Sequence, residues 1–226
     1  IMERIQDLVY THVQGGQFRW VTVSTLMLAL GTILHLVSPS VAGVTPNWTI
    51  ATYCVAILLT RPSLSQTLGI GLVAALINVL TSKSAFPYGN LLSEPGGALT
   101  AALVTRAMLS VKFRKIGGFD LTPILSGFLA TVVSGGIFVT ILWKVLDLPD
   151  NVYMYGMWPM VLIVGALNGA ITPILYIPAQ RLFSKRGMLP STDQLTSDHS
   201  HMTILPERQA KISIEHVNYY HPKATT

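Results

Sequence analysis

Three side chains that could contact a small aromatic solute lie close together in the chain, at Phe86, Tyr88 and Asn90. A proline and a glycine alternate with them, which predicts an irregular loop. The two rings can stack on an aromatic ligand, and the phenol and the amide can hydrogen-bond to it. These residue types at this spacing predict a ligand-binding loop.

The same stretch holds one charge of each sign, Lys83 and Glu94. A free amino acid carries an ammonium and a carboxylate group, and each is costly to remove from water unless it is paired. Lys83 and Glu94 could therefore pair with such a ligand. They could equally pair with each other or remain solvated, and the sequence leaves these alternatives open.

Four further residues are candidates for the same site. Tyr155 and Trp158 could add stacking surface, although an aromatic belt at a membrane interface would place such rings there without any ligand. Asn78 lies within an apolar stretch, where its amide needs a partner from another helix or from a ligand. His35 could hydrogen-bond to a ligand or to a loop carbonyl group.

No set of residues in the sequence predicts catalysis or metal binding. Cys54 is the single cysteine, which excludes a disulfide framework and a cysteine-based metal site. No histidine or acid stands deep in an apolar stretch beside a serine or cysteine, so a membrane hydrolase would lack its nucleophile and base. We therefore expect no catalytic residue, no metal and no cofactor in this chain.

The amino-acid composition predicts that membrane helices position these residues. Of the 226 residues, 50% are hydrophobic and 11% are charged, whereas a soluble domain is about 25% charged. Several stretches approach the roughly 20 apolar residues that span a bilayer. They cover residues 20–37, 46–60, 64–81, 96–113, 121–146 and 159–183. The predicted fold class is an all-α membrane protein with a bundle of six transmembrane helices.

Basic residues predict the orientation of this bundle. Most Lys and Arg side chains fall on one side of a six-helix arrangement, and positive charge stays in the cytoplasm. We expect a multi-pass protein of the cell membrane with both termini cytoplasmic and with outer loops at 38–45, 82–95 and 147–158. The net charge of +5 is thus attributed to orientation and not to nucleic-acid binding.

Helix starts and close helix contacts are also predicted. Pro46, Pro95 and Pro159 suit the first turn of helices that begin on the outer side. Arg106 is either a functional charge within the membrane or a side chain that reaches the cytoplasmic surface. Small residues four positions apart let helix backbones approach closely. The pairs are Gly71 and Ala75, Gly97 and Ala101, Thr131 and Gly135, and Gly165 and Gly169.

Three segments flank the membrane domain, which covers residues 20–187. Residues 1–19 carry an apolar stripe that predicts an amphipathic helix on the cytoplasmic membrane surface, or a solvated tail. Residues 188–210 are polar without periodicity, which predicts a linker. Residues 211–226 alternate apolar and polar side chains, which predicts a single β-strand of an incomplete domain.

Three motifs give the membrane domain a family resemblance. They are Leu34-His35-Leu36-Val37-Ser38-Pro39, Gly43-Val44-Thr45-Pro46, and Leu80 to Asn90 with its core Ala85-Phe86-Pro87-Tyr88-Gly89. Over about residues 20–185 the chain resembles the tryptophan-transporter family. That family looks like a branch of the substrate-binding (S) components of energy-coupling factor (ECF) transporters.

The resemblance implies the substrate-capture component of an ECF-type ABC importer. Such a protein would bind tryptophan, a related aromatic compound or a vitamin from outside. It would deliver the solute inward by toppling with a transmembrane coupling (T) subunit, driven by ATPase subunits that use ATP and Mg²⁺. In S components, small residues spaced by four on the first helix contact the T subunit, and Thr25 and Ala29 match this pattern.

The terminal residues carry a second resemblance. Ile212 to Pro222 is similar to the opening strand of an ABC ATPase, in which an aromatic residue that stacks on adenine precedes a proline. His221 occupies this nucleotide-binding position, and Tyr220 is the competing choice. No G-x-x-x-x-G-K-[ST] loop follows, so the chain given cannot hydrolyse ATP. The resemblance implies a fused ATPase that continues in a longer polypeptide.

Two alternatives to an importer component remain. A stand-alone secondary carrier needs a coupling-ion site, usually an acid within the membrane. The predicted spans place acids only at the outer helix ends, which disfavours such a carrier. A membrane anchor for the fused ATPase would leave the loop from Phe86 to Asn90 without a role.

Overall fold

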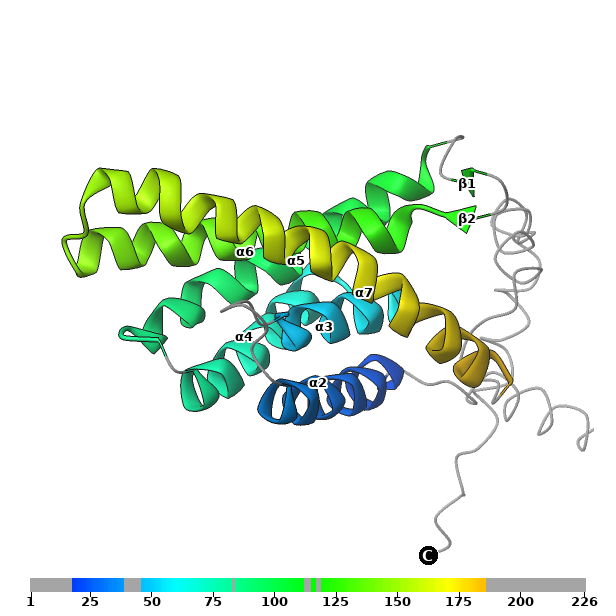
Figure 1. The fold of residues 1–226 in the computed structure, drawn as a ribbon. Coiled ribbons are helices and arrows are strands. Elements are labelled where there is room, and N and C mark those ends of the chain that lie inside the picture. The colour runs from blue at the N-terminus through cyan, green and yellow to red at the C-terminus, as the bar shows by residue number, and fades with distance from the viewer. Residues whose placement is uncertain (1–17, 39–45, 83, 112–114, 117–118, 186–226) are drawn as a thin grey trace, which may run out of the picture. The chain divides into compact units, whose positions relative to one another are not determined.

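The computed structural model describes residues 18–38, 46–82, 84–111, 115–116 and 119–185. Within these ranges lie six α-helices (Figure 1): α2 (Arg19–Val37), α3 (Trp48–Thr60), α4 (Leu64–Thr81), α5 (Asn90–Leu109), α6 (Thr122–Val145) and α7 (Trp158–Lys185). A 3₁₀-helix, η1 (Pro87–Gly89), leads into α5, and a π-helix, η2 (Val152–Met157), leads into α7. Two short strands, β1 (Lys115–Ile116) and β2 (Phe119–Asp120), pair antiparallel between α5 and α6.

The predicted all-α bundle of six transmembrane helices is confirmed in part, because the described residues contain six α-helices together with two short strands. Among the described residues, four helical segments are long and apolar enough to cross a bilayer, namely α2, α4, α6 and the continuous segment Val152–Phe183. The chain is therefore a multi-pass membrane protein. The other two helices fall outside this group, because α3 has only 13 residues and α5 contains acidic, basic and proline residues.

Helix α3 is the centre of the bundle. It contacts the five other α-helices of the described residues, and residues 49–59 are all buried. A helix buried around its whole circumference is stable only when other helices surround it. Its first turn is capped by the Asn47 side chain, whose Oδ1 accepts from the Ile50 N–H at 3.2 Å.

The start of α5 differs from the prediction. Pro87 occupies the first turn of η1, where a proline loses no hydrogen bond, and η1 continues directly into α5 at Asn90. Pro95 consequently lies inside α5. The prediction that Pro95 starts this helix is wrong, and Glu94 is a buried helical residue rather than part of an outer loop.

The structure also locates two other predicted residues. Pro159 lies in the first turn of α7, as predicted, although the π-helix η2 precedes α7 without a break. Arg106 lies in the last turn of α5, where its guanidinium donates to the Pro62 carbonyl oxygen at 2.8 Å. A cation at a helix C-terminus is electrostatically favourable, and the exposed Arg106 side chain has this position.

Residues 1–17 and 186–226 lie outside the described part of the chain. The predicted amphipathic segment, linker and terminal strand, including Tyr220 and His221, therefore stay predictions.

Small residues allow α4, α5 and α6 to approach closely, as their spacing predicts. A Cβ atom on Gly71 of α4 would lie 2.6 Å from the Cα atom of Pro95. A Cβ atom on Gly97 of α5 would lie 2.8 Å from the Cβ atom of Ser134 in α6. Only glycine leaves room for these backbone contacts.

We expect Gly71→Ala to destabilise the protein and Gly69→Ala, on the same helix, not to do so. The new Cβ at position 71 would overlap the α5 backbone, and overpacking costs roughly 1–3 kcal/mol. A Cβ atom on Gly69 meets nothing within 4 Å, and alanine has the better helix propensity. Thermal unfolding of both variants in detergent measures the difference. Equal melting temperatures would contradict the close contact between α4 and α5.

Candidate ligand-binding pocket

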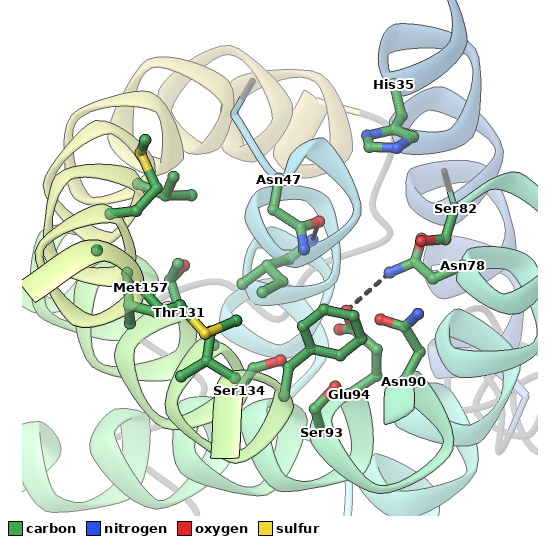
Figure 2. A pocket seen from close by; sticks show the side chains of 18 of the residues that line it. His35, Asn47, Asn78, Ser82, Asn90, Ser93, Glu94, Thr131, Ser134 and Met157 are labelled. Atoms are coloured by element: carbon green, nitrogen blue, oxygen red, sulfur yellow. Dashed lines mark hydrogen bonds between the residues drawn. The ribbon is translucent and has the colours of Figure 1, made fainter. Parts of the chain in front are cut away.

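A cavity of about 470 Å³ lies at one end of the bundle. Its lining residues come from the C-terminal ends of α2 and α4 and the N-terminal ends of α3 and α5, together with α6, η2 and α7. This is the end predicted to face outward. Figure 2 shows side chains from these elements around the cavity. Sites for small molecules have volumes of about 300–1,000 Å³, so the cavity can hold one small ligand.

The cavity has two unlike walls. The first, here called the polar wall, comes from α2 to α5 and their ends and includes His35, Asn47, Asn78, Asn90, Ser93 and Glu94. The second, the apolar wall, comes from α6, η2 and α7. It is mostly apolar, with Phe138, Val152, Met157, Met160 and Val164, and contains the hydroxyl groups of Thr131 and Ser134. A cavity lined in this way suits a ligand with one polar end and one apolar end.

A chain of hydrogen bonds links three helices at the polar wall. The Thr49 hydroxyl of α3 donates to Asn78 Oδ1 of α4 at 3.0 Å. Asn78 Nδ2 then donates to Glu94 Oε1 of α5 at 2.7 Å, the bond drawn in Figure 2. All three side chains are buried. Because Thr49 occupies the amide oxygen of Asn78, the amide NH₂ group is directed at the carboxyl group.

Glu94 is the most unusual member of the polar wall. Only 1% of its surface is exposed, and Oε2 has no hydrogen-bond partner among the described residues. The Asn47 and Tyr53 side chains lie near the carboxyl group and can hydrogen-bond to it, although neither has hydrogen-bond geometry at Oε2. The Ser93 hydroxyl, equally buried, also has no partner in the described part of the chain. Two adjacent residues of the cavity lining thus have buried oxygen atoms without a partner among the described residues.

Other amides are held in place by backbone groups. Asn90 Nδ2 donates to the Pro87 carbonyl oxygen at 2.8 Å. Asn168 of α7 is fully buried, and its Nδ2 donates to the Asn47 carbonyl oxygen at 3.1 Å and to Thr131 Oγ1 at 2.9 Å. These bonds connect α3, α6 and α7 close to the cavity, so the lining side chains of α3 and α6 have fixed positions.

Four of the residues singled out from the sequence line the cavity together, namely His35, Asn78, Asn90 and Glu94. Lys83 lies outside the described residues. Its predicted pairing with Glu94 or with a ligand stays a prediction.

The predicted aromatic residues lie elsewhere. Phe86 and Tyr88 contact each other edge to face at 5.7 Å between ring centroids, and 60% of Tyr88 is exposed. Trp158 packs against Gly136 and Tyr153, and 83% of Tyr155 is exposed. None of the four predicted rings is part of the cavity lining. Phe86 precedes η1 and Tyr88 lies within it, and neither side chain joins Asn90 in the cavity lining.

The side chains that α6 and α7 contribute to the lining are not among the site residues predicted from the sequence. Thr131, Ser134 and Phe138 recur at intervals of three and four along α6, so they share one helix face. Polar residues at helical spacing in an otherwise apolar span were the available signal for this face. Met157 and Met160 carried no such signal, because apolar residues occur on every side of a membrane helix.

A second cavity, of about 400 Å³, lies between α2 and α4. We call it the α2–α4 groove, and it is lined by Trp20, Val21, Ser24, Thr25, Leu28, Ala29, Gly69, Ile70, Val73 and Ile77. The groove is mostly apolar and contains both residues predicted to contact a coupling subunit. Among the described residues, no three His, Cys, Asp or Glu side chains gather closely enough to hold a metal ion.

The fold and the cavity define a multi-pass membrane protein with a pocket for a small solute. The family model described as "Tryptophan transporter TrpP" matches residues 17–184, and the chain belongs to this tryptophan transporter family. It is thus a member of a family of transporters, not of enzymes. No curated protein and no solved structure matches the chain.

The family match does not extend to the terminal segment. It ends at residue 184, and residues 186–226 are outside the described part of the chain. The fused ATPase expected from residues 212–222 therefore has no support from the comparison or from the structure.

We expect Thr49→Val to lower the stability of the protein, whereas Thr60→Val, on the same helix, should have a smaller effect. Valine has the shape of threonine, but it would leave the buried Oδ1 atom of Asn78 without its donor, at a cost of about 1–3 kcal/mol. The Thr60 hydroxyl bonds only to the Ala56 carbonyl oxygen of its own helix. Thermal melting of both variants tests this, and an unchanged Thr49→Val melting temperature would contradict the hydrogen-bond chain.

Proposed function

We propose that the chain captures tryptophan at the outer face of the cell membrane, as the substrate-binding component of an ECF-type ABC importer. The observation that carries the proposal is the cavity with opposed polar and apolar walls in a member of the tryptophan transporter family. Tryptophan has the matching division, with a charged amino-acid group at one end and an indole ring at the other.

The apolar wall supplies the groups that suit an indole ring. Phe138 offers an aromatic face, and aromatic pairs contribute about 0.5–1.5 kcal/mol beyond their buried area. Met157 and Met160 add flexible thioether groups, which make favourable contacts with aromatic rings. The polar wall supplies amides, hydroxyls and a carboxyl group for the other end of the ligand.

Delivery of the solute requires partners in this proposal. The coupling (T) subunit would dock on the α2–α4 groove, because Thr25 and Ala29 both line it and small residues permit close helix contact. ATPase subunits would bind ATP and Mg²⁺, and both termini of the chain given would be cytoplasmic. Arg61 and Arg106 lie at the end of the bundle opposite the cavity, in agreement with this orientation.

The burial of Glu94 favours a second candidate function, a stand-alone secondary carrier. The predicted spans place acids only at outer helix ends, which disfavours such a carrier, but in the structure Glu94 is buried inside the bundle. Buried acids in membrane proteins commonly serve ion coupling. Proteoliposomes that contain the purified chain alone separate the two functions. A carrier accumulates tryptophan under an ion gradient, whereas an importer component binds it without accumulation.

Substitution of Val164 with Trp should weaken tryptophan binding by at least about tenfold, which corresponds to 1.4 kcal/mol. Val164 lines the cavity, and a larger side chain would occupy the space for the ligand. Ile163→Trp is the matched control, because Ile163 is the neighbouring residue and is 49% exposed. Binding of radiolabelled tryptophan to protein in nanodiscs measures both affinities. Equal affinities for the two variants would contradict this location of the site.

Substitution of Ala29 with Trp should block uptake into cells but leave tryptophan binding by the purified protein unchanged. The new ring would fill the α2–α4 groove, which lies apart from the ligand cavity. Leu26→Trp is the control, since Leu26 is on the same helix and is 52% exposed but does not line the groove. Tryptophan uptake is measured in cells that also express the coupling and ATPase subunits. Normal uptake by the Ala29→Trp variant would exclude docking at this groove.

A further inference from the structure

The cavity lining contains one residue of full charge. Glu94 is the only Asp, Glu, Lys or Arg side chain among the described residues that line it. An amino-acid ligand brings two charges, an ammonium and a carboxylate group. The described lining therefore offers a full opposite charge to the ammonium group alone.

One oxygen atom of the Glu94 carboxyl group accepts a hydrogen bond, and the other has no partner among the described residues. Oε1 accepts from Asn78 at 2.7 Å, and Asn78 is itself fixed by Thr49. Oε2 has no hydrogen-bond partner in the described ranges, although the side chain is 99% buried within the bundle. A buried ionised carboxylate with an incomplete set of hydrogen bonds is costly. A ligand group that donates to Oε2 would complete the set.

We propose that Oε2 of Glu94 accepts a hydrogen bond from the ammonium group of the ligand. The amine of the ligand, rather than its carboxylate, then determines which aromatic compounds bind. The inference rests on the proposed function and specifies its substrate class as aromatic compounds that carry a primary amine. Ser93 presents a second unpartnered oxygen from the adjacent position, which can accept another N–H of the same ammonium group. The indole ring then extends to the apolar wall.

Because of this unpaired oxygen atom, the folded protein is expected to be less stable without the ligand than with it. The protein keeps a buried carboxyl group whose second oxygen lacks a partner, and a ligand that supplies the donor stabilises the folded state. Glutamine has nearly the same shape and can keep the bond from Asn78, but it carries no charge. Glu94→Gln should therefore melt at a higher temperature than the parent without ligand, as substitutions that remove functional strain often do.

The test compares three ligands that share the indole ring, namely tryptophan, tryptamine and indole-3-propionate. The parent should bind both amines and should bind indole-3-propionate at least about tenfold more weakly, because that ligand leaves Glu94 unpaired. In Glu94→Gln this preference should fall to near unity, and the rise in melting temperature caused by tryptophan should shrink. Asp147→Asn is the charge-matched control, because Asp147 is exposed and does not line the cavity.

The outcomes separate this inference from the proposed function. A parent that binds neither amine overturns both. A parent that binds tryptophan, with a Glu94→Gln variant that keeps the preference for amines, overturns only the inference. Lys83→Gln supplies the remaining comparison. If the preference for amines appears only in this variant and not in the parent, Lys83 and not the ligand is the partner of Glu94 in the parent, and the inference is overturned.

Discussion

The hydrogen bond between Asn78 and Glu94 is the interaction on which the rest of the pocket depends. It places a carboxyl group at the junction of α3, α4 and α5, and the Thr49 hydroxyl on the central helix fixes its direction. In a bilayer no water competes for such groups, so each polar side chain must find its partner within the protein or on a ligand. The position of the carboxyl group is therefore determined by helix packing and not by a mobile loop.

Close packing of α4 against α5 and a widened helical segment before α7 both shape the cavity. Gly71 brings α4 against Pro95, which lies next to Glu94 in α5. On the opposite side, the π-helix η2 contributes Val152 and Met157 to the lining. A π-helix winds more widely than an α-helix and often occurs at functional sites. The close contact between α4 and α5 thus positions part of the polar wall, and the widened segment forms part of the apolar wall.

The sequence predicted the helices better than it predicted the site, for a physical reason. Apolar runs bounded by turn residues define spans directly, and the predicted range 64–81 coincides with α4. The sequence indicates a helix start at Pro95, whereas in the structure Pro87 begins η1 and Pro95 lies within α5. Because the predicted helix starts too late, the prediction has Glu94 in a loop. Phe138 could not be assigned to the pocket, because an apolar residue in a membrane helix can face lipid, another helix or a cavity.

An acid that pairs with the ligand would also change the electrostatic cost of moving the protein within the bilayer. Under the proposed importer function, the helices carry the bound solute from the outer to the inner side of the membrane. An unpaired carboxylate is costly in such surroundings, whereas a carboxylate paired with an ammonium group within hydrogen-bond distance costs less. Occupancy would thus lower the electrostatic cost of movement, and the empty protein would retain it. The placement of Glu94 in a buried helix, rather than in a solvated loop, is what would allow this difference between the loaded and empty states.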